Sequence, residues 1–169
     1  MNRSKHPRSA ALPVLLAGLC AALGLPATSI AATATSTFSV TATVVPTCLV
    51  SASTVAFGTY SGPQIDATGS VSVTCTNLAA YTVELDAGTG ASATTAARKM
   101  TGPSSATLTY NLYADAARTV VWGTLAALQA AAGVGSGSAQ SLTVYGRVVG
   151  SQVPTAGSYS DTITVTVNY

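Results

Sequence analysis

Apolar and polar residues alternate along most of the chain from residue 36 onward, which is the pattern of β-strands that bury one face. The clearest stretches are GSVSVTCT (69–76), AYTVELDA (80–87), ATLTYNLYAD (106–115), SLTVYGRVVG (141–150) and SYSDTITVTVNY (158–169). Turns rich in Gly, Ser, Thr and Pro join them. The pattern therefore predicts a single all-β domain, built as an antiparallel sandwich.

Three weaker stretches complete this prediction. CLVSASTVAFGTY (48–60) and TVVWGT (119–124) are predicted to be further strands. LAALQAAAG (125–133) is the best helical candidate, and it is predicted to form one or two turns ended by glycine. Neither a domain linker nor an internal repeat is evident in the sequence.

The two ends of the alternating region raise the question of how the sandwich is completed. Within STFSVTATVVPTCLV (36–50), the residues that would form one apolar face are Phe38, Val40, Ala42 and Val44. At the other end, the alternating residues are Ile163, Val165, Val167 and Tyr169. An apolar strand at a sheet edge invites pairing with another strand. Ten extended residues reach about 33 Å, and burying the first set would contribute on the order of 5–8 kcal/mol. Residues 36–50 therefore belong either to the chain's own sandwich or to another molecule.

The first 32 residues are predicted to be a signal peptide. A basic start (Arg3, Lys5 and Arg8) precedes an apolar run over residues 10–25 and the small residues ATSIAAT (27–33). Cleavage is expected after Ala31 or Ala32. A membrane anchor is the less favoured alternative because the run is short. Lipidation at Cys20 is disfavoured because a leucine precedes it.

Removal of this segment changes the charge and the cysteine count. Four basic residues (Arg98, Lys99, Arg118 and Arg147) and five acidic residues (Asp66, Glu84, Asp86, Asp115 and Asp161) remain, which gives a net charge of −1. No basic patch for nucleic acid is predicted. Two cysteines remain, Cys48 and Cys75, and in an exported chain they are expected to form one disulfide.

No feature of the sequence favours an enzyme. The single histidine, His6, lies in the predicted signal peptide, so histidine-based triads and the usual zinc sites are not expected. The acids Glu84 and Asp86 are expected to be solvated, GVGSGS (133–138) to be a flexible loop, and RKM (98–100) to be a basic spot at a strand entrance. Trp122 and the tyrosines are read as core residues, with a sugar-binding surface as the alternative. No cofactor, metal or small-molecule substrate is expected.

Seven pieces of the chain together resemble pilins of the archaic chaperone–usher pathway, also called the spore coat protein U-like family. They are FSVTATVVPTCLVSA (38–52), FGTY (57–60), VSVTCTN (71–77), YTVELDAGTG (81–90), YNLYADAARTVVWG (110–123), LTVYGRVV (142–149) and AGSYSDTITVTVNY (156–169). The chain departs from the family pattern at Thr124, where Asp or Gly is expected after WG.

The resemblance implies an immunoglobulin-like, pilin-type sandwich that lacks its final strand and is completed by a donor strand. Residues 33–46 would be the N-terminal donor-strand extension, with Phe38, Val40, Ala42 and Val44 as donor residues. Residues 47–169 would be the pilin domain, with Cys48 and Cys75 bridging its first two strands. The acceptor edge, which also binds the chaperone, would be formed by Ile163, Val165, Val167 and Tyr169.

The leading functional hypothesis is therefore a structural subunit of a surface fimbria. It would be exported through the periplasm and would support adhesion or biofilm formation. Its implied partners are a periplasmic pilus chaperone, an outer-membrane usher, and neighbouring copies of itself or related pilins. Two alternatives stay open: a carbohydrate-binding or tip-adhesin module that uses Trp122 and exposed tyrosines, and a structural protein of a spore or cell-surface coat. Self-insertion of the donor strand also stays open.

Overall fold

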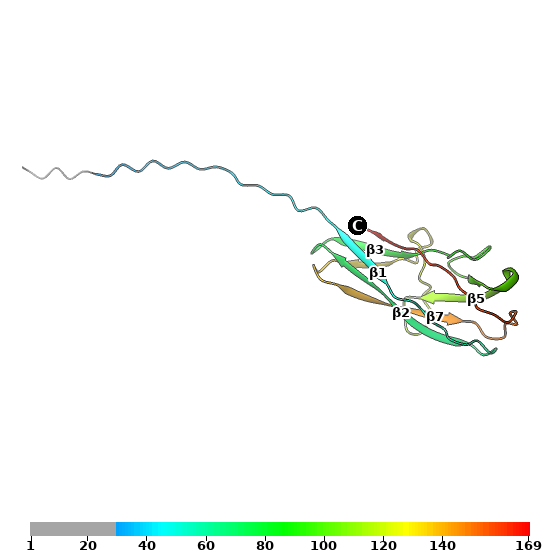
Figure 1. The fold of residues 1–169 in the computed structure, drawn as a ribbon. Coiled ribbons are helices and arrows are strands. Elements are labelled where there is room, and N and C mark those ends of the chain that lie inside the picture. The colour runs from blue at the N-terminus through cyan, green and yellow to red at the C-terminus, as the bar shows by residue number, and fades with distance from the viewer. Residues whose placement is uncertain (1–29) are drawn as a thin grey trace, which may run out of the picture. The chain divides into compact units, whose positions relative to one another are not determined.

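The computed structural model describes residues 30–169 of the chain (Figure 1). The predicted signal peptide lies outside the described residues except for residues 30–32. The chain divides into two units between Thr41 and Ala42. Residues 30–47 have no regular secondary structure. Among residues 30–169, no helix has the length and hydropathy needed to cross a lipid bilayer.

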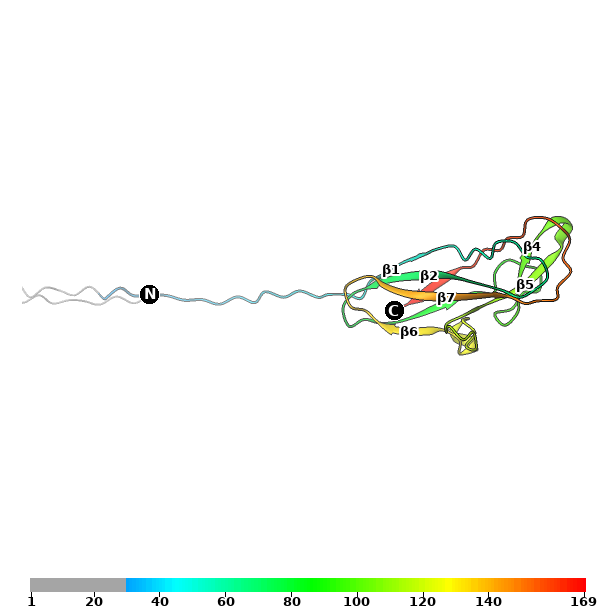
Figure 2. The same ribbon diagram turned by 90° about the horizontal axis from the view of Figure 1, so that it is seen from below.

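The second unit is built from antiparallel strands in two sheets (Figure 2). In chain order, the strands are β1 (Cys48–Ala52), β2 (Ile65–Cys75), β3 (Ala80–Leu85), β4 (Arg98–Thr101), β5 (Thr107–Tyr113), β6 (Ala131–Val134), β7 (Gln140–Val148) and β8 (Val165–Asn168). One sheet has the order β1-β2-β7-β5-β4 and the other has the order β6-β3-β8. Two 3-10 turns, Pro103–Ser105 and Leu125–Ala127, are the helical elements among the described residues. The predicted all-β antiparallel fold is confirmed.

The core lies between the two sheets and is built by alternate residues of the strands. Its buried residues are Val71, Val73 and Cys75 of β2, Tyr81, Val83 and Leu85 of β3, Leu108, Tyr110 and Leu112 of β5, Val144 and Val148 of β7, and Trp122. Trp122 is 1% exposed, and its indole nitrogen donates a hydrogen bond of 2.9 Å to the carbonyl oxygen of Val83. The core interpretation of Trp122 is therefore correct, and a sugar-binding surface that uses it is ruled out.

Arg98, at the start of β4, is completely buried. Its guanidinium donates hydrogen bonds to five oxygen atoms, which are the carbonyl oxygens of Leu85, Asp86, Thr95 and Trp122 and the side-chain oxygen of Asn111. Burial lowers the pKa of Arg98. The expected strand entrance at residues 98–100 is confirmed, because β4 begins at Arg98. The Arg98 side chain reaches into the interior and satisfies main-chain acceptors there.

Several predicted strands are shorter in the structure than their alternation indicated. β1 ends at Ala52, so residues 53–60 are outside it, and β8 covers only Val165–Asn168. The stretch 119–124 contributes one isolated bridge, between Tyr113 and Val121. The helical candidate 125–133 contains one 3-10 turn and the first residues of β6.

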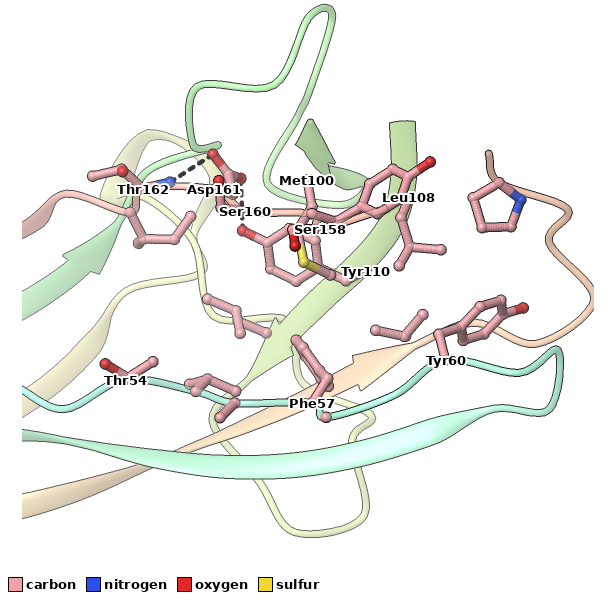
Figure 3. Close-up of a pocket in the computed structure, with 18 of the residues that line it drawn as sticks. Thr54, Phe57, Tyr60, Met100, Leu108, Tyr110, Ser158, Ser160, Asp161 and Thr162 are labelled. Atoms are coloured by element: carbon pink, nitrogen blue, oxygen red, sulfur yellow. Dashed lines mark hydrogen bonds between the residues drawn. The ribbon is translucent and has the colours of Figure 1, made fainter. Parts of the chain in front are cut away.

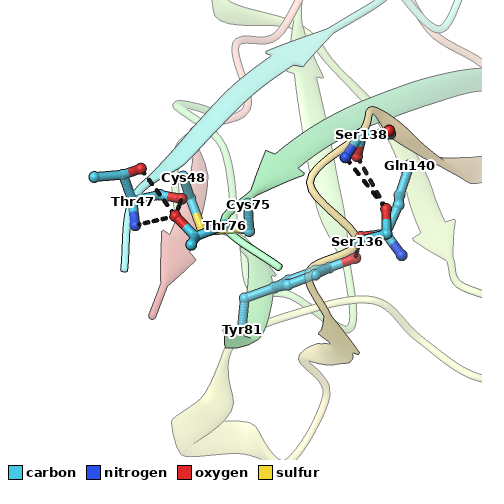
Figure 4. The surroundings of a disulfide bond; sticks show 8 residues. All are labelled: Thr47, Cys48, Cys75, Thr76, Tyr81, Ser136, Ser138 and Gln140. Atoms are coloured by element: carbon cyan, nitrogen blue, oxygen red, sulfur yellow. Dashed lines mark hydrogen bonds between the residues drawn. A yellow bond between two sulfur atoms is a disulfide. The ribbon is translucent and has the colours of Figure 1, made fainter. Parts of the chain in front are cut away.

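The predicted disulfide between Cys48 and Cys75 is present, and it joins residues that lie opposite each other on β1 and β2 (Figure 4). Beside it, the amide of Thr47 donates to the Thr76 hydroxyl at 3.0 Å, and the amide of Thr76 donates to the carbonyl oxygen of Thr47 at 2.9 Å. The bond therefore fastens β1, an edge strand, at the point where the chain enters the sandwich.

We expect replacement of both Cys48 and Cys75 by serine to lower the free energy of unfolding by about 3–4 kcal/mol, because the bridge closes a loop with a sequence separation of 27 residues. Urea unfolding followed by circular dichroism measures the difference. As a control, a reducing agent should destabilise the unmodified chain to the same extent and leave the double variant unchanged. Equal stability of the two proteins would contradict the prediction.

Candidate functional site

A groove with a volume of about 1130 Å³ runs along the side where the two sheets separate (Figure 3). Residues 52–62 line one rim and residues 152–163, with Val165, line the other. Apart from Ser70, the residues between the rims are apolar or aromatic: Val71, Leu85, Met100, Leu108, Tyr110, Leu112, Val144 and Val148. All of these except Met100 are buried, so the groove has an apolar floor that belongs to the core, and its half-buried apolar side chains lie mainly on the rims.

The first rim is the segment that follows β1. Its last ladder bond runs from the amide of Ser53 to the carbonyl oxygen of Ser70 at 2.8 Å. Beyond it, Val55 and Phe57 are half-buried and alternate with exposed residues. They pack where the side chains of Gly69 and Gly146 would lie: a Cβ on Gly69 would come 2.7 Å from Val55, and one on Gly146 would come 2.7 Å from Phe57. The segment therefore leaves the sheet edge and lies over the inner faces of β2 and β7.

The second rim is the segment that leads into β8. Tyr159, Asp161, Ile163 and Val165 are half-buried and alternate with exposed residues. On one side this segment is already paired, because Ser160 exchanges two main-chain hydrogen bonds with Thr101 (2.8 and 3.1 Å) and the carbonyl oxygen of Thr164 accepts the amide of Asp86 (3.1 Å).

The opposite side of the second rim is an open edge. Successive main-chain groups of an extended segment point to opposite sides. Those of Asp161 and Ile163 therefore face away from β3 and β4, and among residues 30–169 neither makes a main-chain hydrogen bond. The groove thus combines an apolar floor with unpaired main chain, which is the chemistry that receives an additional β-strand.

Tyr110 links the floor of the groove to the second rim. Its hydroxyl donates a 2.7 Å hydrogen bond to the carboxylate of Asp161. The other carboxylate oxygen of Asp161 accepts the amide of Thr89 at 2.7 Å and its hydroxyl at 2.8 Å. From the first rim, the Phe57 ring meets the Tyr110 ring edge-on, with the centroids 6.0 Å apart. Burial, the hydrogen bond to Asp161 and the negative charge of Asp161 raise the pKa of Tyr110.

The two acids expected to be solvated, Glu84 and Asp86, each accept a hydrogen bond from the C-terminal segment. Glu84 accepts hydrogen bonds from the amide of Leu125, at 2.8 Å, and from the side-chain amide of Asn168. Asp86 accepts the amide of Thr164 at 3.0 Å. Glu84 and Asp86 alternate with the buried Tyr81, Val83 and Leu85, as expected, and they are half-buried rather than fully solvated because neighbouring main-chain and side-chain groups donate to them.

The predicted acceptor residues are only partly in the groove. Ile163 and Val165 line it. Val167 packs against the core, and Tyr169 lies beyond the end of β8 with 60% of its surface exposed. The other rim includes Val55, Phe57 and Tyr60. It was not predicted from the sequence, because residues 48–60 were expected to form a strand of the sheet.

The predicted donor residues are among the most exposed apolar residues described. Phe38 is 88% exposed, Val40 is 84% exposed and Val44 is 81% exposed, and Ala42 is also exposed. Because these residues are exposed, the structure of one chain does not decide whether they pair with the chain's own sandwich or with another molecule.

Comparisons with known proteins give matches to a family model, to a protein sequence and to a solved structure. A family model described as Spore Coat Protein U domain matches residues 34–166. Protein U of Myxococcus xanthus is 33% identical over 178 residues, which cover 94% of this chain and 99% of that protein. A chain in the crystal structure of the CsuC-CsuE chaperone-tip adhesion subunit pre-assembly complex, from archaic chaperone-usher Csu pili of Acinetobacter baumannii, superposes with a TM-score of 0.56 at 25% identity. The match covers 75% of this chain and 40% of that one.

We expect Tyr110 to make the stability of the fold sensitive to alkali. Because its pKa is raised from the ordinary value of 10.0, the folded state favours the neutral phenol. The resulting stabilisation is present below about pH 10 and is lost as the pH rises above it, by up to about 1.4 kcal/mol per pH unit. Urea unfolding between pH 8 and 11 measures this slope. Tyr110→Phe should flatten the slope and Tyr169→Phe should retain it; parallel curves for the unmodified chain and Tyr110→Phe would refute the assignment.

Proposed function

This chain belongs to the Spore Coat Protein U domain family, and from that membership we propose that it is a structural subunit of an exported surface fimbria, assembled by donor-strand exchange. In this proposal residues 33–46 are a donor segment and residues 47–169 are the pilin domain that receives the donor segment of another copy. The match to a chain of a chaperone–usher pilus complex covers 75% of this chain, which supports a role as a pilus subunit.

One observation carries the proposal: the chain has an open groove and an exposed apolar segment that is suited to fill it. The groove offers apolar side chains below and unpaired main chain at its second rim. The segment offers side chains of the same character at every second position, from Phe38 to Val44. Ten extended residues span about 33 Å, and the part of the second rim that alternates as an extended segment runs only from Tyr159 to Val165. The segment is therefore long enough to follow that part of the rim.

The proposed partners follow from the need to cover the groove before assembly. An apolar groove open to solvent is prone to non-specific association. A periplasmic chaperone that lends a strand would cover it during export, and the matched structure is a complex of a chaperone with a pilus subunit. An outer-membrane usher would then exchange that strand for residues 33–46 of the next subunit. Export would depend on the predicted signal peptide at residues 1–32.

The fibre would support adhesion or biofilm formation as a structural element. A sugar-binding role in this domain is less well supported, because Trp122, Tyr81 and Tyr110 are buried. A role in a spore or cell-surface coat is supported by the family's description, and it is compatible with the same strand exchange.

We expect Val40→Asp to abolish assembly, because it places a charge in the apolar groove of the neighbouring copy. In cells that carry the matching chaperone and usher, electron microscopy and unboiled gel electrophoresis of surface extracts measure fibres and subunit ladders. Val40 is exposed in the single chain, so the fold of the subunit should be retained.

The matched control is Thr41→Asp, which introduces the same charge on the opposite face of the segment and should leave assembly largely intact. Deletion of residues 33–45 should leave a subunit that binds the chaperone but cannot fill a neighbour's groove. Fibres formed from the deletion variant alone would rule out the proposed assembly.

A further inference from the structure

A line of contacts crosses the floor of the groove. Phe57 from the first rim meets the Tyr110 ring edge-on, and Tyr110 reaches the second rim through its 2.7 Å hydrogen bond to Asp161. Figure 3 shows Phe57 and Tyr110 facing each other from the two sides of the pocket. We call Phe57, Tyr110 and Asp161 the bridge.

The bridge is held in place from several directions. Gly146 leaves space for the Phe57 ring, because a Cβ there would lie 2.7 Å from it. Tyr110 is 4% exposed. Asp161 is anchored by the amide and hydroxyl of Thr89 and by the amide of Thr162. A strand entering the groove therefore meets a floor at the bridge that cannot easily move away.

Apolar residues line the groove on the two sides of the bridge. Along β5, Leu108, Tyr110 and Leu112 face the core at alternate positions, so Tyr110 is the middle one of three. On the Leu112 side, Leu85 and Val165 lie opposite each other in the second sheet. On the Leu108 side, the lining includes Met100, which pairs with Leu108. Because the Phe57 and Tyr110 rings already meet across the groove, we expect an occupant strand to place a small side chain on the bridge and larger apolar side chains beside it.

The donor segment of this chain has one small residue in its apolar face. The side chains along that face are Phe38, Val40, Ala42 and Val44. We propose that Ala42 of a second copy lies on the bridge, so that Phe57 and Tyr110 select the register in which one subunit's donor segment enters the groove of the next. Val44 then lies on one side of the bridge, and Val40, followed by Phe38, lies on the other. This inference rests on the proposed function and assigns specific residues to its register.

The test measures binding of a synthetic peptide that corresponds to residues 36–45. The receptor is the full chain with Val40→Asp. This substitution prevents the receptor's own donor segment from competing with the peptide for the groove. Fluorescence anisotropy gives the dissociation constant of the labelled peptide. Overfilling a close-packed position weakens binding strongly, so we expect Ala42→Leu in the peptide to raise the dissociation constant about tenfold or more.

A receptor that also carries Phe57→Ala distinguishes contact at the bridge from a general loss of affinity. Removal of the Phe57 ring makes room for the larger side chain, so the Ala42→Leu peptide should bind this receptor to within about threefold of the unmodified pair. Thr43→Leu in the peptide adds a leucine to the outward face and should change binding less than threefold. Circular dichroism confirms that both receptors are folded.

The possible outcomes distinguish an error in the proposed register from an error in the proposed strand exchange. If the unmodified peptide binds and Ala42→Leu binds equally well, or if Phe57→Ala fails to rescue it in a folded receptor, the register is wrong and strand exchange stands. If the unmodified peptide does not bind at all, both the register and the proposed occupant are wrong, and a strand from a different protein fills the groove.

Discussion

The rest of the structure depends on one constraint, which is that the sandwich has no strand between residues 53–61 and residues 152–165. A sandwich is stable when its apolar interior is covered and its main-chain groups are paired. Here apolar side chains on the two rims, among them Val55, Phe57 and Ile163, are only half-buried, and the main chain is unpaired along the edge at Asp161 and Ile163. Under the proposed assembly, an extended segment with apolar residues at every second position would meet both needs.

Elsewhere in the domain, polar side chains form hydrogen bonds with main-chain groups at places where strands end. Where β7 stops at Val148, the side-chain amide of Gln152 accepts the main-chain amide of Thr109 at 2.7 Å and donates to its carbonyl oxygen at 2.9 Å, as a neighbouring strand would. Arg98 satisfies carbonyl oxygens that no strand reaches. A buried charge carries a desolvation cost. Here Arg98 joins the end of β3, the start of β4 and the segment at Trp122.

The sequence predicted the fold well and the groove only in part, for a definable reason. Period-2 alternation reports which face of an extended segment is buried, and it predicted β2, β3, β5 and β7 from their side chains alone. It does not report whether the main chain has a partner. Residues 53–60 alternate as a strand does, yet they lie outside the ladder because Gly69 and Gly146 admit Val55 and Phe57 to the inner face. Arg98 and Trp122 were ambiguous because their burial depends on contacts between distant segments.

Under the proposed assembly, two features of the donor segment would exclude different shifts of register: its apolar alternation and the small side chain of Ala42. A shift by one residue would place Ser39, Thr41 and Thr43 in the groove, and the loss of apolar burial would reject that register. A shift by two residues keeps the apolar face inward, so alternation alone cannot exclude it. Under the proposed assembly, such a shift would place Val40 or Val44 on the Phe57–Tyr110 contact, where an alanine fits. The smallest side chain of the segment contributes least to burial, but it would fix the position of the others.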